Sequence, residues 1–323
     1  MKRTLLLIAA LLCAGCANQE RSFSANPPSV PGAYATPGAV LFRPNTRGWF
    51  VRPNFPERLV YVAAGDAILV YPERGGRKAP LAEITQGVSS AYGVCFDREG
   101  NLYVANQYGN NVTVYPPGAT SPSKFYSGSL ARPLYPIVDR QGRLWVSNAD
   151  NGTVTEYSRD GSRVKLVLQT PGVEADGMDF DSNGDLFVAY RTSAHGNGSI
   201  EEFPEGSSHG TVLGMTLDQP QSVIVMPTGT ILAVETGGPD RIDVFPSGYT
   251  APVLEVGLNK VPTQLAVTAT YGSVYVSSFS NDSVYVTPYP LQAHGDPNHL
   301  HEKIDASGYG TVQGIALNNG QVF

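Results

Sequence analysis

Short apolar runs alternate with turn residues along most of this chain. Residues 93–96 are apolar, residues 97–100 (Asp-Arg-Glu-Gly) have the composition of a tight turn, and residues 101–106 form a second apolar run. The same turn chemistry recurs at 139–142 and 181–184, where glycine supplies the positive φ that closes a hairpin. The pattern predicts pairs of short antiparallel strands and an all-β fold.

The second strand of each predicted hairpin recurs at a nearly constant period. Its copies start at residues 59, 101, 143, 185, 230 and 273, with spacings of 42, 42, 42, 45 and 43 residues. A period of about 40–45 residues is typical of a propeller blade of four strands. A third strand ending in an aromatic residue and an edge strand, such as 163–168, complete the unit. The sequence therefore predicts a six-bladed β-propeller of four-stranded antiparallel blades.

The predicted inner strands indicate how the ring closes. Six of them can be recognised, at residues 93–96, 136–139, 177–180, 222–225, 265–268 and 314–317. The last follows the final complete unit, whereas the first unit has no clear inner strand before it. We therefore expect the C-terminal strand to pair with the N-terminal blade, which leaves no sheet edge open between the two ends. Residues 40–42 or 48–51 are alternative sources of that strand.

Composition and charge agree with this fold and exclude some functions. The 323-residue chain has 35 Gly and 25 Pro, and only 15% of its residues are charged, which favours turns and strands over helices. Its net charge is −6, and no basic run follows the first three residues, so nucleic acid is not an expected partner. Cys95 is the single cysteine outside the leader and cannot form an internal disulfide.

The first 16 residues have the pattern of a signal peptide. Lys2 and Arg3 precede an apolar run at 5–12 that is too short to span a bilayer. Residues 12–16 (Leu-Cys-Ala-Gly-Cys) resemble the bacterial lipobox, which implies lipidation of Cys16 and a lipid-anchored location in the cell envelope. The motif usually has Leu where Cys13 stands, and cleavage after Ala17 by an ordinary signal peptidase is the alternative.

Two further segments follow this leader. Residues 17–38 are rich in Pro, Ser, Asn and Ala without periodicity, and predict a disordered tether. Residues 39–323 contain the repeats and form the predicted propeller domain.

The repeats resemble NHL repeats. This resemblance rests on residues 97–106 followed by 109–115 and extends over about residues 58–320. The NHL pattern favours Asp at the position of Asn106 and often has Arg at the position of Val112. Because these arginines are missing and the chain is acidic, the RNA-binding role of some NHL proteins is not expected here.

Two enzyme families have similar blades. Residues 175–188, with Ala-Asp-Gly-Met at their start, resemble the gluconolactonase (regucalcin-like) segment whose Asp binds a divalent metal, so the resemblance implies Asp176 as a ligand. The metal-binding Glu and the Asn-Gly of that family have no clear counterpart. Residues 91–94 with 100–104 resemble streptogramin lyase blades, but their catalytic His has no match in this chain.

The repeats also predict which side chains meet at one mouth of the central channel. Inner strands start where second strands end, because the two are antiparallel. Alignment of the copies predicts one ring of Tyr92, Leu134, Asp176, Gln221, Gln264 and Gln313, and a second of Ala64, Asn106, Asn148, Tyr190, Glu235 and Ser278. Oxygen donors of this kind suit Ca²⁺ or another divalent cation, or a polar ligand. A water-filled polar mouth is the alternative interpretation.

Two functions follow from these observations. The first is an envelope lipoprotein with a monomeric, non-catalytic propeller that binds an envelope protein or a small ligand. Its expected ligand-binding residues are Tyr92, Gln221, Gln264, Gln313 and Tyr190. The second is a divalent-metal-dependent lactonase or lyase. Its expected metal ligands are Asp176, Glu235, Asn106 and Asn148, and the first two would be its catalytic residues.

Overall fold

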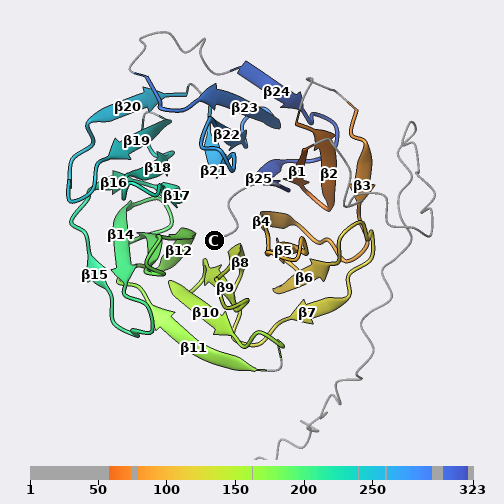
Figure 1. The fold of residues 1–323 in the computed structure, drawn as a ribbon, viewed down its shortest axis with the longest axis horizontal. Coiled ribbons are helices and arrows are strands. Elements are labelled where there is room, and N and C mark those ends of the chain that lie inside the picture. Colours follow the sequence, from red (N-terminus) through yellow and green to blue (C-terminus); the bar gives the residue numbers. More distant parts are fainter. Residues whose placement is uncertain are drawn as a thin grey trace, which may run out of the picture. The chain divides into compact units, whose positions relative to one another are not determined.

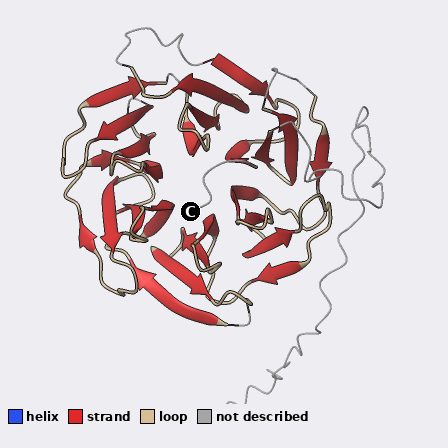
Figure 2. Ribbon diagram, in the orientation of Figure 1, coloured by secondary structure: helices blue, strands red, loops and turns tan. Residues whose placement is uncertain are grey.

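Six antiparallel sheets surround a central axis in the computed structural model (Figure 1). The structure describes residues 58–73, 79–161, 163–238, 240–258, 260–292 and 301–318. Every regular element in these ranges is a strand (Figure 2). The predicted six-bladed, all-β propeller is therefore confirmed, whereas the predicted leader with Cys16 and the tether lie outside the described residues.

Each blade is a meander of strands that runs outward from the axis. Blade 1 consists of β25 (Val312–Leu317), β1 (Leu59–Ala64), β2 (Ala67–Pro72) and β3 (Ala82–Ile84). Blade 2 consists of β4 (Ala91–Phe96), β5 (Leu102–Asn106), β6 (Asn111–Tyr115) and β7 (Lys124–Tyr126). Blade 3 consists of β8 (Pro133–Val138), β9 (Leu144–Asn148), β10 (Thr153–Tyr157) and β11 (Val164–Gln169).

The second half of the ring follows the same plan. Blade 4 consists of β12 (Glu174–Phe180), β13 (Leu186–Arg191), β14 (Asn197–Phe203) and β15 (Thr211–Val212), and β16 (Leu217–Asp218) also pairs with β14. Blade 5 consists of β17 (Pro220–Val225), β18 (Ile231–Glu235), β19 (Arg241–Phe245) and β20 (Leu254–Gly257). Blade 6 consists of β21 (Pro262–Val267), β22 (Ser273–Ser278), β23 (Ser283–Pro288) and β24 (His301–Asp305).

The C-terminal strand closes the ring, as the sequence predicts. Strand β25 pairs antiparallel with β1, with Ile315 opposite Val62. Beyond the strand, the Leu59 N–H donates to Asn318 Oδ1 at 2.8 Å, and the Asn318 N–H donates to the Leu59 carbonyl oxygen. The alternative segments, 40–42 and 48–51, lie outside the described residues.

The hydrophobic core is divided among the joints between neighbouring blades. Successive side chains of a strand point to opposite faces of its sheet, so an apolar strand in the middle of a blade packs against both neighbouring blades. Tyr61 of blade 1 contacts Phe96 of blade 2 edge-on at a centroid distance of 4.9 Å, and Trp145 of blade 3 contacts Phe180 of blade 4 at 6.0 Å. Each blade is thus stabilised by its neighbours.

The ring has two distinct faces. On the loop face lie the loops between blades and the hairpins that join second and third strands, such as residues 107–110. On the turn face lie the hairpins that join first and second strands, such as residues 97–101. Asp97 fixes that turn, because its Oδ1 accepts the N–H groups of Glu99 and Asn101 at 2.9 and 2.8 Å.

A β-bulge interrupts every inner strand at the same level near the loop face. The pairing shifts between residues 91 and 94, 133 and 136, 175 and 178, 220 and 222, and 262 and 265, and in β1 between Ala63 and Ala64. Pro262 pairs with Ser278 as Pro220 pairs with Glu235, so Thr263 is the counterpart of Gln221. The predicted ring position of Gln264 is therefore wrong by one residue, because the bulge sets which residue of the inner strand lies at this level.

Candidate functional site

Three of the predicted metal ligands serve the same local purpose. Asn106, Asn148 and Glu235 end the second strands of blades 2, 3 and 5. The side-chain oxygen of each accepts a backbone N–H from the residue 17 positions earlier, in the segment that leads into the inner strand of its own blade. These donors are Ser89, Ala131 and Asp218, at 2.9, 3.0 and 3.0 Å. The three residues therefore fix the loops between blades.

The two asparagines are also bonded within their blades. Asn106 Nδ2 donates to Thr113 Oγ1 at 3.1 Å, and Asn148 Nδ2 donates to Thr155 Oγ1 at 3.1 Å. All four side chains are fully buried. A buried amide that has partners for both its oxygen and its nitrogen stabilises one conformation of the blade end.

Asp176 belongs to a buried ion cluster at the start of blade 4. Arg191 donates from Nε to Asp176 Oδ2 at 2.8 Å and from Nη2 to Asp176 Oδ1 at 3.1 Å. The same Nη2 lies 2.6 Å from Glu174 Oε1, and Arg132 approaches that oxygen at 3.5 Å. Asp176 has no exposed surface, and Glu174 and Arg191 are also buried.

The pKa values of these acids reflect burial and the nearby cation. Burial raises the pKa of Asp176, and the Arg191 guanidinium opposes this by stabilising the ionised carboxylate. The carboxylates in turn raise the pKa of Arg191, which stays charged. Burial likewise raises the pKa of Glu235 to about 7, although Arg241 lies 2.8 Å from its Oε2.

These contacts test whether the four predicted ligands fit a metal ion. Their six oxygen atoms all accept from, or are ion-paired with, a protein donor. A cation at Asp176 would have to replace a guanidinium that already binds both oxygens. Across the described ranges, no group of three or more His, Cys, Asp or Glu side chains is arranged to hold a metal. The residues as placed do not fit, and metal binding stays a prediction.

Two tyrosines span the channel at the level of the bulges. Tyr92 Oη of blade 2 donates to Gln221 Oε1 of blade 5 at 3.1 Å, and Tyr135 Oη of blade 3 donates to the Thr263 carbonyl of blade 6 at 3.0 Å. Each pair joins blades on opposite sides of the ring (Figure 1). The two rings meet edge to face, with centroids 5.4 Å apart. Tyr92 and Gln221 are thus brought together as contacts of the ring itself.

Close approach of the inner strands leaves little other room at this level. A Cβ on Gly93 would lie 2.5 Å from the Leu134 carbonyl oxygen, and a Cβ on Gly177 would lie 2.5 Å from Ser222 Cα. The glycines that follow Tyr92 and Asp176 are therefore required for the inner strands to approach this closely. Tyr135 is buried at this level, and the alternative of a water-filled polar mouth stays a prediction.

The remaining predicted ligand-binding residues have different surroundings. Gln264 Oε1 accepts the Ile315 N–H at 3.0 Å, and its Nε2 donates to the Val94 carbonyl at 3.3 Å, so it also links blades. Tyr190 is buried opposite Ser199 within blade 4. The Gln313 carbonyl accepts from Ser277 Oγ at 2.9 Å, while its side chain is half-buried.

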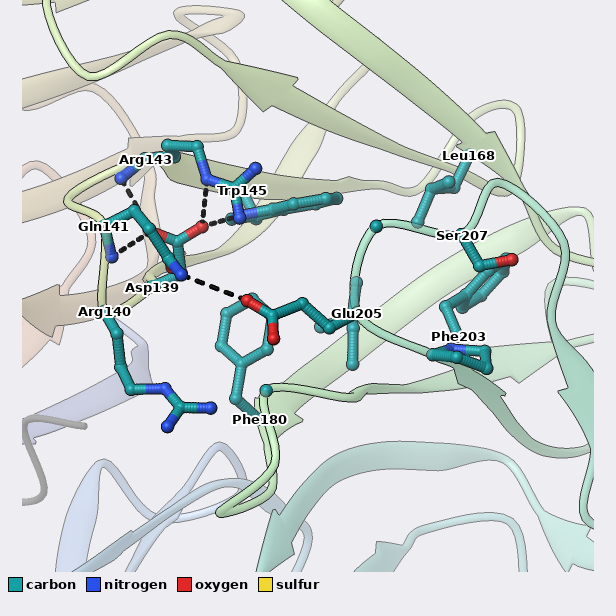
Figure 3. A pocket seen from close by; sticks show the side chains of 14 residues that line it. Asp139, Arg140, Gln141, Arg143, Trp145, Leu168, Phe180, Phe203, Glu205 and Ser207 are labelled. Atoms are coloured by element: carbon teal, nitrogen blue, oxygen red, sulfur yellow. Dashed lines mark hydrogen bonds and ion pairs between the residues drawn. The ribbon is translucent and has the colours of Figure 1, made fainter.

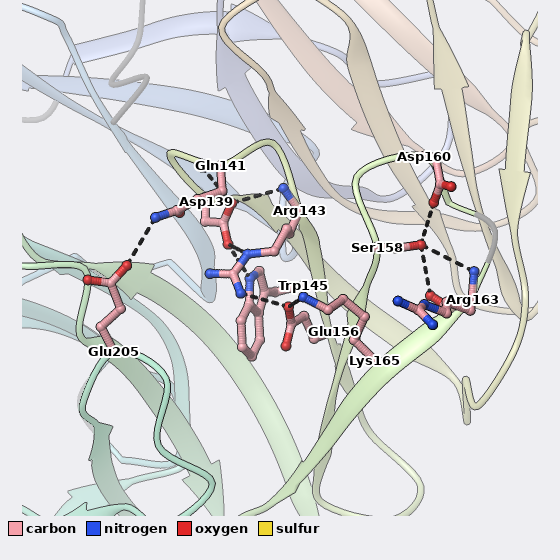
Figure 4. A network of polar contacts seen from close by, with 10 residues as sticks. All are labelled: Asp139, Gln141, Arg143, Trp145, Glu156, Ser158, Asp160, Arg163, Lys165 and Glu205. Carbon is pink, nitrogen blue, oxygen red and sulfur yellow. Dashed lines mark hydrogen bonds and ion pairs between the residues drawn. The ribbon is translucent and has the colours of Figure 1, made fainter.

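A pocket at the joint between blades 3 and 4 opens on the turn face. Figure 3 shows Trp145, Phe180 and Phe203 beside the Asp139 turn, and Gln141 donates to Glu205 at 3.0 Å across the joint. Figure 4 shows that Arg143 connects Asp139 with Glu156, at 2.6 and 2.9 Å. The pocket volume is about 20 Å³, which is room for about one water molecule. These contacts stabilise the joint between the blades.

Exposed apolar side chains occur on the loop face outside the ring of bulges. Tyr108, in the hairpin between β5 and β6, is 79% exposed, and Phe279, in the hairpin between β22 and β23, is 48% exposed. Val173, in the loop before β12, is also exposed. Aromatic side chains in such positions are typical anchors of protein interfaces.

Comparisons with known proteins support the fold. Neither the models of protein families nor the curated proteins give a match. A chain from the crystal structure of a nidogen/laminin complex superimposes with a TM-score of 0.68 at 14% identity, over 81% of this chain and 98% of that chain.

A second solved structure gives the same result. A protein of unknown function from Bacteroides caccae superimposes with a TM-score of 0.60 at 11% identity, also over 81% of this chain and 98% of that chain. These likenesses show a β-propeller fold. At such low identity they carry no function to this chain.

Two arginines that pair with the predicted acids were not predicted from the sequence. Arg191 directly follows Tyr190 at the end of its strand, and Arg241 faces Glu235 across a hairpin. A strand-register argument would have found Arg241, because the two residues pair directly. The same argument places Arg191 opposite Glu174, but its contact with Asp176 lies at the bulge between Ala175 and Met178, where simple register no longer holds.

Proposed function

We propose that this protein is a bacterial cell-envelope lipoprotein whose propeller binds a partner and does not catalyse a reaction. One observation carries the binding role. The polar residues at the loop-face mouth are bonded to the ring itself, whereas Tyr108 and Phe279 project from the same face with large exposed surfaces. Exposed aromatic residues on a rigid scaffold suit recognition. We therefore place the binding surface on the loop face, around these hairpins.

The leader supports the envelope location. Its basic start, short apolar run and Cys16 match a lipoprotein signal peptide. No helix among the described residues is long and apolar enough to cross a membrane. In blades 2, 3 and 4 an Asp side chain accepts backbone N–H groups of the turn between the first and second strands, as in the segment on which the NHL resemblance rests. We therefore include descent from NHL-like repeats in the proposal.

The lipid anchor is tested by the mass of the mature protein isolated from bacterial membranes. We expect an N-terminal Cys16 carrying acyl chains, and a Cys16→Ser variant that leaves the membrane fraction. A mature protein that begins at Asn18 without lipid would instead show cleavage after Ala17 and would contradict the anchor.

The binding surface is tested by chemical crosslinking in intact cells. We expect a defined crosslinked partner that is lost in a Tyr108→Ser, Phe279→Ser double variant. Tyr249→Ser is the matched control, because Tyr249 is 56% exposed but follows β19 on the turn face. Equal loss in the control, or none in the double variant, would contradict a loop-face surface.

The enzymatic alternative is tested with a screen of lactones and lyase substrates. We expect no turnover that depends on Asp176, because Arg191 binds both oxygens of its carboxylate. Turnover by the wild type that disappears in Asp176→Ala, with folding intact, would support the lactonase or lyase instead.

A further inference from the structure

A cavity of about 130 Å³ lies in the central channel on the turn-face side of the two tyrosines. The inner strands of all six blades line it, so it is part of the ring and not of one joint. Apolar side chains line it beside polar groups of similar exposed area, with Val138, Phe180, Val267 and Leu317 at the strand ends nearest the turn face. Tyr92 and Tyr135 cross the channel at its other end. A ligand would therefore enter from the turn face.

Asp179 is the one carboxylic acid among the residues that line this cavity. Its Oδ1 accepts the Phe180 N–H at 2.9 Å, and its Oδ2 accepts the Val225 N–H of the neighbouring blade at 2.8 Å. A carboxylate has about four acceptor positions, so about two remain for a donor in the cavity. The residue is half-buried and belongs to the cavity lining.

The surroundings of Asp179 favour a cationic partner. Burial raises the pKa of this carboxyl to about 7, because a carboxylate that is shielded from water is less stable than a hydrated one. Asp139 on blade 3, by contrast, is ion-paired with Arg143. An ammonium group placed beside Asp179 would supply the opposite charge that the cavity lining lacks.

We propose that this cavity binds a small primary amine with an apolar body about the size of a benzene ring, its ammonium group on Asp179. An apolar cavity of about 150 Å³ in another protein holds benzene, so the volume here suits a body of this size. The proposal concerns the turn face and is independent of the loop-face surface proposed above. The competing interpretation is that Asp179 only ties β12 to Val225.

Three small aromatic molecules of similar size, one cationic, one neutral and one anionic, distinguish a binding role of Asp179 from a purely structural one. We would titrate the purified protein calorimetrically at pH 8 with benzylamine, benzyl alcohol and benzoate. We expect benzylamine to bind about 10- to 100-fold more tightly than benzyl alcohol, the usual range for a charged hydrogen bond, and benzoate not to bind.

Variants place the binding in the cavity. Ala266→Leu adds side-chain volume to the lining, and should weaken benzylamine and benzyl alcohol alike. Asp179→Asn should remove the preference for benzylamine and change benzyl alcohol binding less than about threefold. Glu99→Gln is the matched control, because Glu99 is an exposed acid on the same face and does not line the cavity.

Several results would overturn the proposal. These are no measurable benzylamine binding at millimolar concentration, equal affinity for all three compounds, or unchanged binding in Ala266→Leu. If Asp179→Asn unfolds, the charge series and Ala266→Leu still decide, provided that Ala266→Leu melts at the wild-type temperature.

Discussion

Replacing Arg191 with leucine tests the buried ion cluster at the channel mouth. Arg191 binds both oxygens of Asp176, at 2.8 and 3.1 Å, and lies 2.6 Å from Glu174. Leucine removes the cation but keeps an apolar side chain, so two buried carboxylates lose their partner. Breaking a buried ion pair from one side costs about 3–5 kcal/mol. We expect a loss of that size in the free energy of unfolding at pH 8.

The loss should depend on pH in a defined direction. Without Arg191, burial and the neighbouring Glu174 carboxylate both raise the pKa of Asp176, with only the more distant Arg132 opposing them, and place it above the value in the unfolded chain. An acid with a raised pKa in the folded state binds a proton more readily when folded, so stability falls as pH rises towards that pKa. Arg191→Leu should therefore lose less stability, relative to wild type, at pH 5 than at pH 8.

Urea unfolding followed by circular dichroism measures both effects. Arg159→Leu is the control, because its ion pair with Glu99 is exposed on both sides and should cost at most about 1 kcal/mol. The double variant Asp176→Leu, Arg191→Leu should recover part of the loss, because no charge of that pair is left unpaired. A loss below about 1 kcal/mol, equal at both pH values, would refute the reasoning and leave Asp176 free for other ligands.

Three further predictions follow from the same contacts. Gly314→Ala should lower the melting temperature strongly, because the added Cβ would overlap the Tyr92 carbonyl oxygen. Gly257→Ala is the control and should not lower it, because no atom lies within 4 Å of the added Cβ; equal shifts would contradict the close approach at Gly314. Burial raises the pKa of Glu235 to about 7, so the stability of the wild type relative to Glu235→Gln, measured by urea unfolding, should be lower at pH 8 than at pH 5. The opposite sign would show that the attraction of Arg241 for the ionised carboxylate outweighs the effect of burial. Calorimetric titration with Ca²⁺, Mg²⁺, Mn²⁺ and Zn²⁺ should show no tight binding at Asp176, because Arg191 binds both of its oxygens. Tight binding by the wild type that is lost in Asp176→Ala would support a metal site there.

The architecture could be predicted because its signals are local and repeated. A hairpin is specified by its turn and its two short strands, and the Asp-x-x-Gly turn occurs at 97–100, 139–142 and 181–184. Six copies of the second strand at nearly one period leave few alternatives to a ring. Ring closure could be predicted by counting strands. The first blade lacks an inner strand, and the inner strand at 314–317 follows the last complete unit, so the two were expected to pair, as they do. The second-strand residues Asn106, Asn148 and Glu235 were also placed correctly at the loop face.

The chemistry of the channel depended on contacts that no local pattern contains. Tyr92 and Gln221 are separated by 129 residues and meet only because the ring is narrow at its bulges. The bulges set which side chain turns inward, which moved Thr263 into the place predicted for Gln264. They also bring Asp176 to Arg191.

The sequence by itself thus determined the blades, their number and their closure, because turns and strand alternation act over short distances and repeat. Only the tertiary structure decided that the predicted metal ligands are bonded to the protein, that tyrosines cross one end of the channel, and that Asp179 lies in the cavity at the other. Those outcomes depend on the width of the closed ring and on the register at each bulge, which are set by all six blades together.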